Sequence, residues 1–187
     1  TLDYPEPGTD RSMAEYPLQL IREFVLRDGT PITIRPIRPD DADIEQAFVR
    51  GLSEESRYNR FMTTIDELPP KKLAFFTEVD YQQHMALIAT IVRDGQEQEI
   101  GVARYVASET AGECEFAVTV ADEWQGKGLA SLLMRELMEA ARDRGFKTID
   151  GLVFATNQRM LDLARKLGFE VETILGEGET VRVLRSL

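Results

Sequence analysis

The sequence has few of the residues that build covalent or metal-held frameworks. Its 187 residues include one cysteine, Cys114, and one histidine, His84. A single cysteine excludes an internal disulfide, and a reducing compartment is the simple setting for such a chain. Without a histidine–cysteine cluster, a zinc site of the usual kind is also excluded. We therefore expect no metal and predict a cytoplasmic protein.

Long apolar runs are also missing. No stretch of the chain is apolar for long enough to cross a bilayer. Residues 1–22 do not show the basic-then-apolar order of a secretory signal peptide. We therefore expect neither a membrane span nor a membrane partner.

Basic residues are fewer than acidic ones, 22 against 33, so the formal net charge is -11 at pH 7. Phosphate contacts need a basic surface, so nucleic acid is not expected as a partner. An acidic surface is compatible with a cationic substrate such as an amine. The simpler interpretation is that the charge keeps the protein in solution. A polyanionic cofactor stays possible if local backbone dipoles and Lys127 bind it.

The remaining composition is that of an ordinary globular domain, with 43% hydrophobic and 29% charged residues. A chain of this length forms one domain with a sizeable core. Residues 1–17 are polar and rich in proline, and we expect them to form a mobile leader. Residues 18–187 are expected to form the single domain.

Hydrophobic periodicity and turn residues predict an alternation of strands and helices. In the first long helix, which Pro39 opens, the expected apolar face is Ile44, Ala47, Phe48 and Leu52. The order of elements implies one α+β domain with a mixed, mainly antiparallel sheet flanked by helices. We expect a hairpin at 24–35, helices from 39 and at 53–61, 69–78, 129–144 and 157–167, and strands at 85–92, 99–106, 113–121, 148–154, 169–174 and 180–184.

The most informative segment is 113–130, in which a strand enters a glycine loop that a strong helix follows. Gly126 and Gly128 carry no Cβ, so a phosphate can come close to the backbone. The first turn of the next helix leaves N–H groups without partners, at the positive end of the helix dipole. A pyrophosphate fits such a site. The loop lacks the Gly-x-x-x-x-Gly-Lys-Ser/Thr pattern, which argues against an NTPase.

Two motifs resemble those of the GNAT superfamily of N-acetyltransferases. Segment 125–130, Gln-Gly-Lys-Gly-Leu-Ala, resembles its Gln/Arg-x-x-Gly-x-Gly/Ala loop. Segment 157–169 resembles its second signature, a helix that starts with Asn and ends in Lys-x-Gly-Phe. Segments 34–41, 53–61 and 115–120, with Tyr16-Pro17, are further similar to the acetyltransferase domain of bacterial Pat-type protein lysine acetyltransferases.

The resemblance implies a GNAT-like fold, acetyl-CoA as cosubstrate and an amine as acceptor. In that family, the strand before the loop holds the pantetheine arm through its backbone, and the loop amides hold the pyrophosphate. Lys127 either adds charge near the phosphates or is a solvated loop lysine. The implied cofactor-binding set is Phe116, Val118, Val120, Gln125, Gly126, Lys127, Gly128, Leu129, Ala130, Asn157, Met160 and Lys166.

Glu115 is the candidate catalytic residue. A lysine amine with a pKa of about 10.4 must lose a proton before it attacks, which costs roughly 4 to 5 kcal/mol at pH 7. A carboxylate whose pKa is raised by burial can accept that proton. Pat-type domains use a glutamate at the matching position, whereas the sequence alone favours a surface glutamate on an edge strand. Glu113 shares its face in a regular strand and is the second candidate.

No general acid can be named, because Leu163 and Ala164 stand where many family members have a tyrosine. The leading hypothesis is therefore protein lysine acetylation by direct attack. A small amine as acceptor and a non-catalytic module that senses acyl-CoA stay as alternatives. The oligomeric state stays open.

Several other residues have simpler structural interpretations. We expect His84 to be an ordinary structural residue, and Cys114 a small core residue on the strand face opposite Glu115. Trp124 is expected to pack beneath the loop. The helix expected at 53–61 carries cationic and aromatic residues that could bind an acceptor protein or the cofactor's nucleotide. A helix with a buried aromatic face and exposed arginines explains them equally well. Those residues are Arg57, Tyr58, Arg60 and Phe61.

Overall fold

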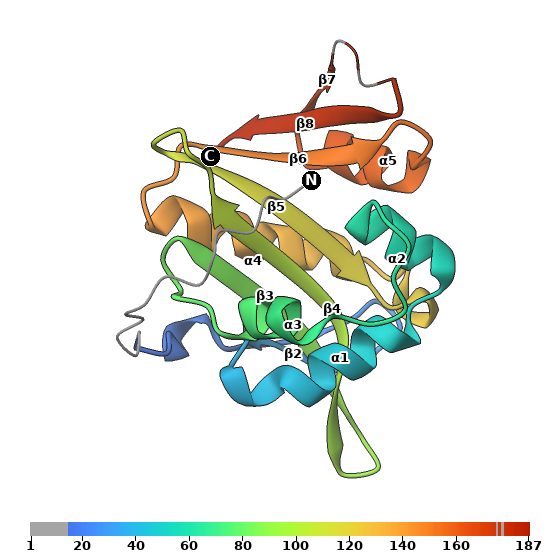
Figure 1. Cartoon of the computed structure of the whole chain (residues 1–187). Coiled ribbons are helices and arrows are strands. Elements are labelled where there is room, and N and C mark those ends of the chain that lie inside the picture. The colour runs from blue at the N-terminus through green and yellow to red at the C-terminus, as the bar shows by residue number, and fades with distance from the viewer. Residues whose placement is uncertain (1–14, 175, 177) are drawn as a thin grey trace.

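The computed structural model describes residues 15–174, 176 and 178–187, and every structural statement below concerns these residues. One eight-stranded sheet runs through them in the order β1-β2-β3-β4-β5-β6-β8-β7 (Figure 1). Its neighbouring strands are antiparallel except for β5 and β6, which are parallel. The predicted mixed, mainly antiparallel sheet is therefore confirmed. The strands are β1 (Arg22–Val25), β2 (Pro31–Pro36), β3 (His84–Arg93), β4 (Gln96–Ala107), β5 (Glu113–Val120), β6 (Thr148–Phe154), β7 (Glu170–Thr173) and β8 (Thr180–Ser186).

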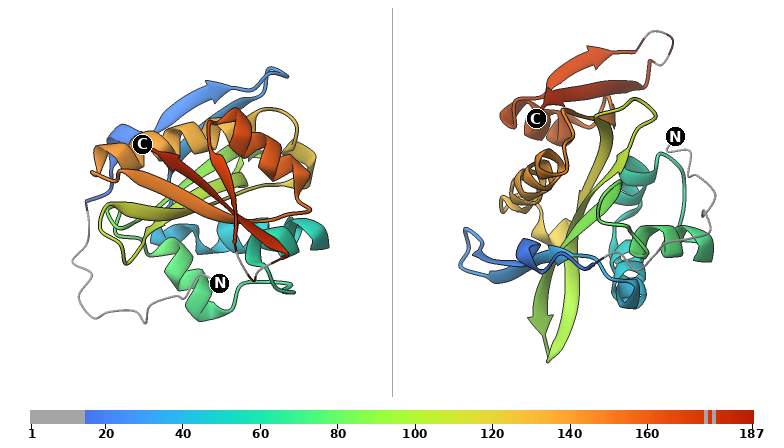
Figure 2. Two further views of the ribbon diagram at one scale, coloured as in Figure 1. Left: turned by 90° about the horizontal axis from the view of Figure 1, so that it is seen from above. Right: turned by 90° about the vertical axis from the view of Figure 1, so that its left-hand side faces the viewer.

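Helices cover both faces of this sheet. Figure 2 shows α1, α2 and α3 on one face and α4 on the other, with α5 on the side of α4. The helices are α1 (Ala42–Gly51), α2 (Glu54–Phe61), α3 (Pro70–Thr77), α4 (Leu129–Asp143) and α5 (Gln158–Lys166). Short 3-10 turns add η1 (Leu18–Leu20), η2 (Pro39–Asp41) and η3 (Asp122–Trp124). None of the helices described here has both the length and the apolarity that a bilayer crossing requires.

Capping residues that can be recognised in the sequence determine where several helices start and end. The Ser53 hydroxyl accepts a hydrogen bond from the Ser56 amide at 3.2 Å and starts α2. The side chain of Asn157 starts α5 in the same way, accepting from the Met160 amide at 3.2 Å. Gly145, with a φ of +88°, follows the end of α4, where only glycine adopts the left-handed conformation without cost.

Two sequence expectations need correction. In α1, Ala47 is exposed while Glu45 is buried, because Glu45 turns inward to meet Arg104 of β4 at 3.3 Å. The expected leader also ends too late. Tyr16 packs edge-on against Tyr81, and its hydroxyl donates to the Pro36 carbonyl at 2.8 Å. Residues 1–14 of that leader lie outside the described part of the chain.

Strand β5 has two distinct side-chain faces. Gly101 of β4 lies against Leu133 and Leu129 of α4, and it pairs with Val120, so even-numbered residues of β5 face α4. Arg104 of β4 reaches α1 and α3, and it pairs with Ala117. Odd-numbered residues of β5, including Glu115, therefore face α1, α2 and α3.

The backbone of β5 is only partly paired on its β6 side. The Ala121 amide donates to Ile100 and the Ser108 amide to Glu113, both at 2.9 Å, so odd-numbered residues turn their polar backbone groups toward β4. Even-numbered residues turn theirs toward β6. The β5–β6 ladder spans only three pairs and ends at Glu115 with Asp150. Beyond that point the carbonyl of Phe116 and the backbone of Val118 lie outside this ladder.

Candidate active site

The glycine loop has the conformation that an anion site needs. Gly126 and Gly128 have φ values of +76° and +88°, which side chains other than glycine rarely adopt. Gly128 is the N-cap of α4 and makes no side-chain cap bond, so the first amides of the helix point out of its end. Leu129 is almost fully buried, with its side chain against Gly101, so only its backbone can serve a ligand. Ala130 is half-buried in the same first turn.

A basic cavity of about 200 Å³ adjoins this helix end. Arg27 comes from the hairpin between β1 and β2, and its guanidinium lies 3.6 to 3.9 Å from where a Cβ on Gly128 would stand. Arg135 and the exposed Lys166 complete the cationic lining. The sequence reasoning missed Arg27 and Arg135. Arg135 looks like an ordinary solvent-facing helix residue, and nothing local places Arg27 beside a loop a hundred residues later.

The side chain of Lys127 is half-buried and contacts neighbouring residues. Its ammonium lies 2.8 Å from a carboxylate oxygen of Asp28 and 4.9 Å from the centre of the Trp124 ring. The hydrogen bond from Lys127 lowers the pKa of Asp28 to about 2. Trp124 is buried below the loop, as expected. Lys127 thus ties the loop to the β1–β2 hairpin while its charge stays beside the glycines.

Gln125 joins the loop to three other elements. Its amide nitrogen donates to the Val120 carbonyl at 3.1 Å and to the Ser56 hydroxyl of α2 at 3.4 Å. Its amide oxygen accepts from Arg159 of α5 at 2.8 Å. The Val120 carbonyl is thus one of the β5 backbone groups turned away from β4. Gln125 fixes the end of β5 between the two helices.

Phe116 and Asn157 lie where the two strands part. Phe116 is buried, with its ring 5.2 Å from that of Phe169. A Cβ on Gly151 of β6 would come within 2.8 Å of the Phe116 ring, so glycine is required there for this close packing. Asn157 caps α5 through its oxygen, a bond that does not use its NH₂ group. Met160, one turn later, is half-buried against the core.

Glu115 is half-buried on the face of the sheet that α1, α2 and α3 cover. Burial raises its pKa, and the nearby carboxylate of Asp150 raises it further, while Arg60 and Arg182 oppose this. Asp150 is the register partner of Glu115 on β6 and accepts from Arg182 of β8 at 2.7 Å. Asp150 and Arg182 were not anticipated, because the pairing of β5 with β6 and β8 is not written in any local pattern.

Glu113 is less well placed than Glu115. It shares the same face of β5, as strand alternation predicted, and its carboxylate lies 3.9 Å from Arg182. The cation that holds Asp150 therefore also faces Glu113.

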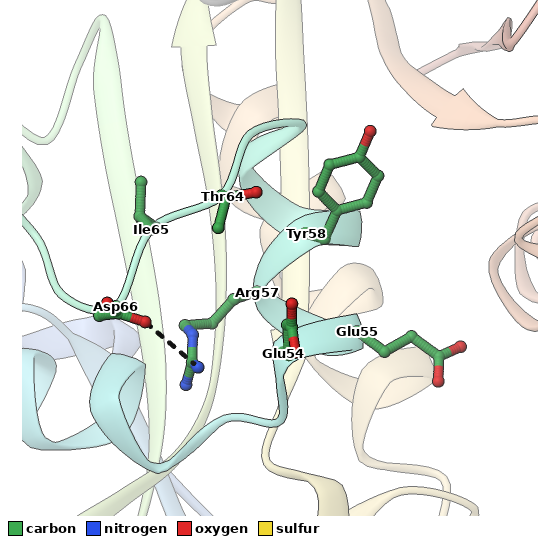
Figure 3. Close-up of a pocket in the computed structure, with 7 residues that line it drawn as sticks. All are labelled: Glu54, Glu55, Arg57, Tyr58, Thr64, Ile65 and Asp66. Atoms are coloured by element: carbon green, nitrogen blue, oxygen red, sulfur yellow. Dashed lines mark ion pairs between the residues drawn. The ribbon is translucent and has the colours of Figure 1, made fainter.

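An acidic groove of about 520 Å³ opens beside α2 (Figure 3). Glu54 and Glu55 line it from the first turn of α2, and Asp66 lines it from the segment after α2. Arg57 reaches toward Asp66 at 3.9 Å, and it also donates to the Leu52 carbonyl. Arg57 is thus part of the framework of this groove rather than a free anion-binding group.

Asp122 holds α2 next to the glycine loop. Its carboxylate accepts from the Ser53 amide at 2.9 Å and from the hydroxyls of Ser53 and Ser56 at 2.7 and 2.8 Å. Tyr58 of the same helix is 45% exposed and stacks on Phe154 at the end of β6, with ring centres 5.2 Å apart and planes 3° apart. The acidic groove is therefore fixed relative to both strands of the site.

The single cysteine and the single histidine are both buried. Cys114 is fully buried on the face opposite Glu115, and burial raises the pKa of its thiol to about 12, so it is a poor nucleophile. The buried His84 contacts Arg104, with their nitrogens 3.0 Å apart. No three potential metal-ligating side chains come together within the described ranges.

The structure also contains a buried polar cluster that the sequence did not predict. Glu45 of α1 and Glu99 and Arg104 of β4 are each at most 3% exposed. Burial raises the pKa of Glu99 well above its usual range, and the facing Glu45 carboxyl raises it further. This cluster lies between the sheet and α1.

Comparisons with known proteins show the family of this chain. The family described as "Acetyltransferase (GNAT) domain" matches residues 32–170. Acetyltransferase PA5475 of Pseudomonas aeruginosa is 42% identical over 144 residues, which are 77% of each chain. Acetyltransferase Pat of Mycolicibacterium smegmatis is 30% identical over 76% of this chain and 42% of its own length. The crystal structure of the GNAT domain of S. lividans PAT superposes with a TM-score of 0.85 at 32% identity, covering 92% of this chain and all of that domain.

Proposed function

This chain belongs to the GNAT family of acetyltransferases, which use acetyl-CoA as donor, and we propose that it acetylates lysine side chains of proteins with Glu115 as general base. The observation that carries the proposal is the half-buried Glu115 carboxyl, whose pKa is raised on the face of the sheet that α1, α2 and α3 cover. The Pat-type relatives support a protein acceptor.

The donor is proposed to lie along β5 and across the glycine loop. The carbonyl of Phe116 and the backbone of Val118, which lie beyond the β5–β6 ladder, offer hydrogen bonds to the amide groups of the pantetheine arm. The NH₂ group of Asn157 can donate to the same arm. The amides at Gly126, Gly128 and Ala130 face the pyrophosphate, with the positive end of α4 behind them. The basic cavity supplies positive charge for the phosphate group of coenzyme A that is not part of the pyrophosphate. Its cations are Arg27, Arg135 and Lys166.

The acceptor is proposed to approach from the face that Glu115 shares with α2. Glu54, Glu55 and Asp66 surround the groove there, and carboxylates of this kind favour a basic segment around the target lysine. The formal net charge of -11 acts in the same direction. A cationic substrate thus meets complementary charge before it reaches Glu115.

The reaction needs one proton transfer at Glu115. The lysine ammonium gives its proton to the carboxylate, and the neutral amine then attacks the thioester carbon. A base with a raised pKa accepts this proton more readily than an ordinary carboxylate does. As the C–S bond breaks, the attacking nitrogen releases its second proton to solvent and the coenzyme A thiolate takes a proton from water, since Leu163 and Ala164 offer no acid where many family members have a tyrosine.

The test is thiol release from acetyl-CoA with a lysine-rich protein mixture as acceptor. We expect the Glu115→Gln variant to bind acetyl-CoA normally in calorimetry and to lose at least about a hundredfold in turnover. Glu113→Gln, two residues away on the same face, is the matched control and should retain activity. Equal turnover in wild type and Glu115→Gln would exclude Glu115 as the base.

Other outcomes separate the remaining functions. Turnover with small amines such as polyamines, but none with proteins, would identify a small-molecule acetyltransferase. Tight donor binding without turnover on any acceptor would identify a module that senses acyl-CoA. A cytoplasmic location stays a prediction that cell fractionation can check.

A further inference from the structure

A cationic and aromatic cluster lies between α2 and α3, outside the site described above. The rings of Phe61 and Phe76 are stacked, with centres 6.2 Å apart and planes 22° apart. The Arg60 guanidinium lies 4.9 and 5.4 Å from these two ring centres. The Lys72 ammonium lies 4.8 and 5.9 Å from the same centres. Two cations thus share one aromatic pair.

This environment changes the chemistry of the Lys72 amine. Lys72 is half-buried, and burial together with the neighbouring Arg60 lowers its pKa to about 8. At pH 7 an amine with this pKa is neutral in about one molecule in ten, against about one in 2,500 for an ordinary lysine. The neutral form is the one that can attack a thioester.

The same cluster lies on the catalytic face of the sheet. Arg60 acts on the pKa of both Lys72 and Glu115, so its charge is within electrostatic range of both groups. Phe76 also lies under Arg104, whose guanidinium carbon is 4.0 Å from the ring centre, and Arg104 pairs with Ala117 of β5. Ala117 and Glu115 share one face of β5. Lys72 therefore stands on the side of the sheet from which an acceptor amine would reach the donor.

We propose that Lys72 is an acetyl acceptor of this protein itself, in a self-acetylation that rests on the acetyltransferase function proposed above. The neutral Lys72 nitrogen attacks the carbonyl carbon of acetyl-CoA, an amide bond forms and the C–S bond breaks. The nitrogen loses its proton to Glu115, and the coenzyme A thiolate is protonated by solvent. The products are Nε-acetyl-Lys72 and free coenzyme A.

The environment of Lys72 favours this product. Acetylation replaces a half-buried ammonium that faces Arg60 with a neutral amide, so it removes a like-charge repulsion and a desolvated charge. Lys71, the preceding residue of α3, is exposed and provides a matched comparison within the same molecule.

The experiment is incubation of the full chain with deuterated acetyl-CoA, followed by peptide mass spectrometry. The chain has only five lysines, so each can be followed separately. We expect Lys72 to gain label at least about tenfold faster than the exposed Lys71, because the lowered pKa of Lys72 raises the fraction of its neutral amine. The Glu115→Gln variant should lose most of the label at Lys72. Lys72→Arg should remove it and keep transfer to an added lysine peptide.

An added peptide in the same samples separates this inference from the proposed function. Peptide acetylation with Lys72 labelled no faster than Lys71 would overturn the inference alone. Equal labelling of Lys72 in wild type and Glu115→Gln would show spontaneous acylation and also overturn it. If neither the peptide nor any lysine is labelled while the donor binds, both proposals fail. A rate per molecule that is independent of protein concentration indicates transfer within one chain, and a rate that rises with concentration indicates transfer between copies; either supports Lys72 as the acceptor.

Discussion

At the scale of single residues, Glu115 depends on side chains from two other strands. Burial and the carboxylate of Asp150 raise its pKa, whereas Arg182 lowers it. A general base must be ionised, so turnover should fall as pH decreases through this raised pKa. In Asp150→Asn the repulsion from the Asp150 carboxylate disappears, and the acid limb of the kcat profile should move to lower pH.

The matched control for this shift is Glu113→Gln. Glu113 lies 3.9 Å from Arg182 but is not the strand partner of Glu115, so the acid limb of Glu113→Gln should stay closer to that of wild type. The measurement is kcat against pH at saturating acetyl-CoA for the three proteins. An acid limb that does not move in Asp150→Asn would show that the limb belongs to another group.

At the scale of an element, the start of α4 determines where the donor's phosphates can bind. Gly128 has a φ of +88°, so Gly128→Ala should lose roughly 1–2 kcal/mol of unfolding free energy. The new methyl group also projects toward Arg27, 3.6 Å away, where a pyrophosphate would approach. We expect acetyl-CoA to bind at least about tenfold more weakly, which is about 1.4 kcal/mol.

Gly145 gives the matched variant at the other end of the same helix. It has the same φ of +88°, and a Cβ there would meet nothing within 4 Å. Gly145→Ala should therefore cost similar stability in urea unfolding and leave donor binding unchanged in calorimetry. Equal donor affinities in the two variants would show that the pyrophosphate does not bind at this turn.

At the scale of the whole molecule, the buried pair Glu45 and Glu99 makes stability depend on pH. The pKa of Glu99 is raised in the folded state, so the native protein holds a proton that the unfolded chain releases. The stability from this proton is full below the unfolded pKa and is lost as pH rises toward the folded one, by up to about 1.4 kcal/mol per pH unit. Glu99→Gln should therefore unfold with a flatter pH dependence and be more stable than wild type at pH 8.

Urea unfolding at pH 6 and pH 8 checks this expectation. Glu23→Gln, on the exposed strand β1, is the control and should keep the wild-type pH dependence. If Glu99→Gln showed the same loss of stability between the two pH values as wild type, Glu99 would already be ionised in the folded protein.

The element order and the glycine loop follow from the sequence. Hydrophobic periodicity, the Ser53 and Asn157 caps and Gly145 are local signals, and each helix and strand that they predict is present in the described chain. Strand alternation also placed Glu115 opposite Cys114 correctly. These features are predictable because a residue's neighbours along the chain suffice to set them.

Only the tertiary structure brought distant residues to the site. It brings Arg27 beside Gly128, and it brings Asp150 and Arg182 beside Glu115. It also places the Lys72 ammonium over the aromatic rings that the Arg60 guanidinium contacts. It also turned Glu45 inward, where the periodicity of α1 favoured Ala47. Periodicity tells which side of an element is buried, but not which strand becomes its neighbour, in what register, or which charge lies opposite. Those relations arise when the sheet closes and its helices pack, and the pKa values of Glu115 and Lys72 depend on them.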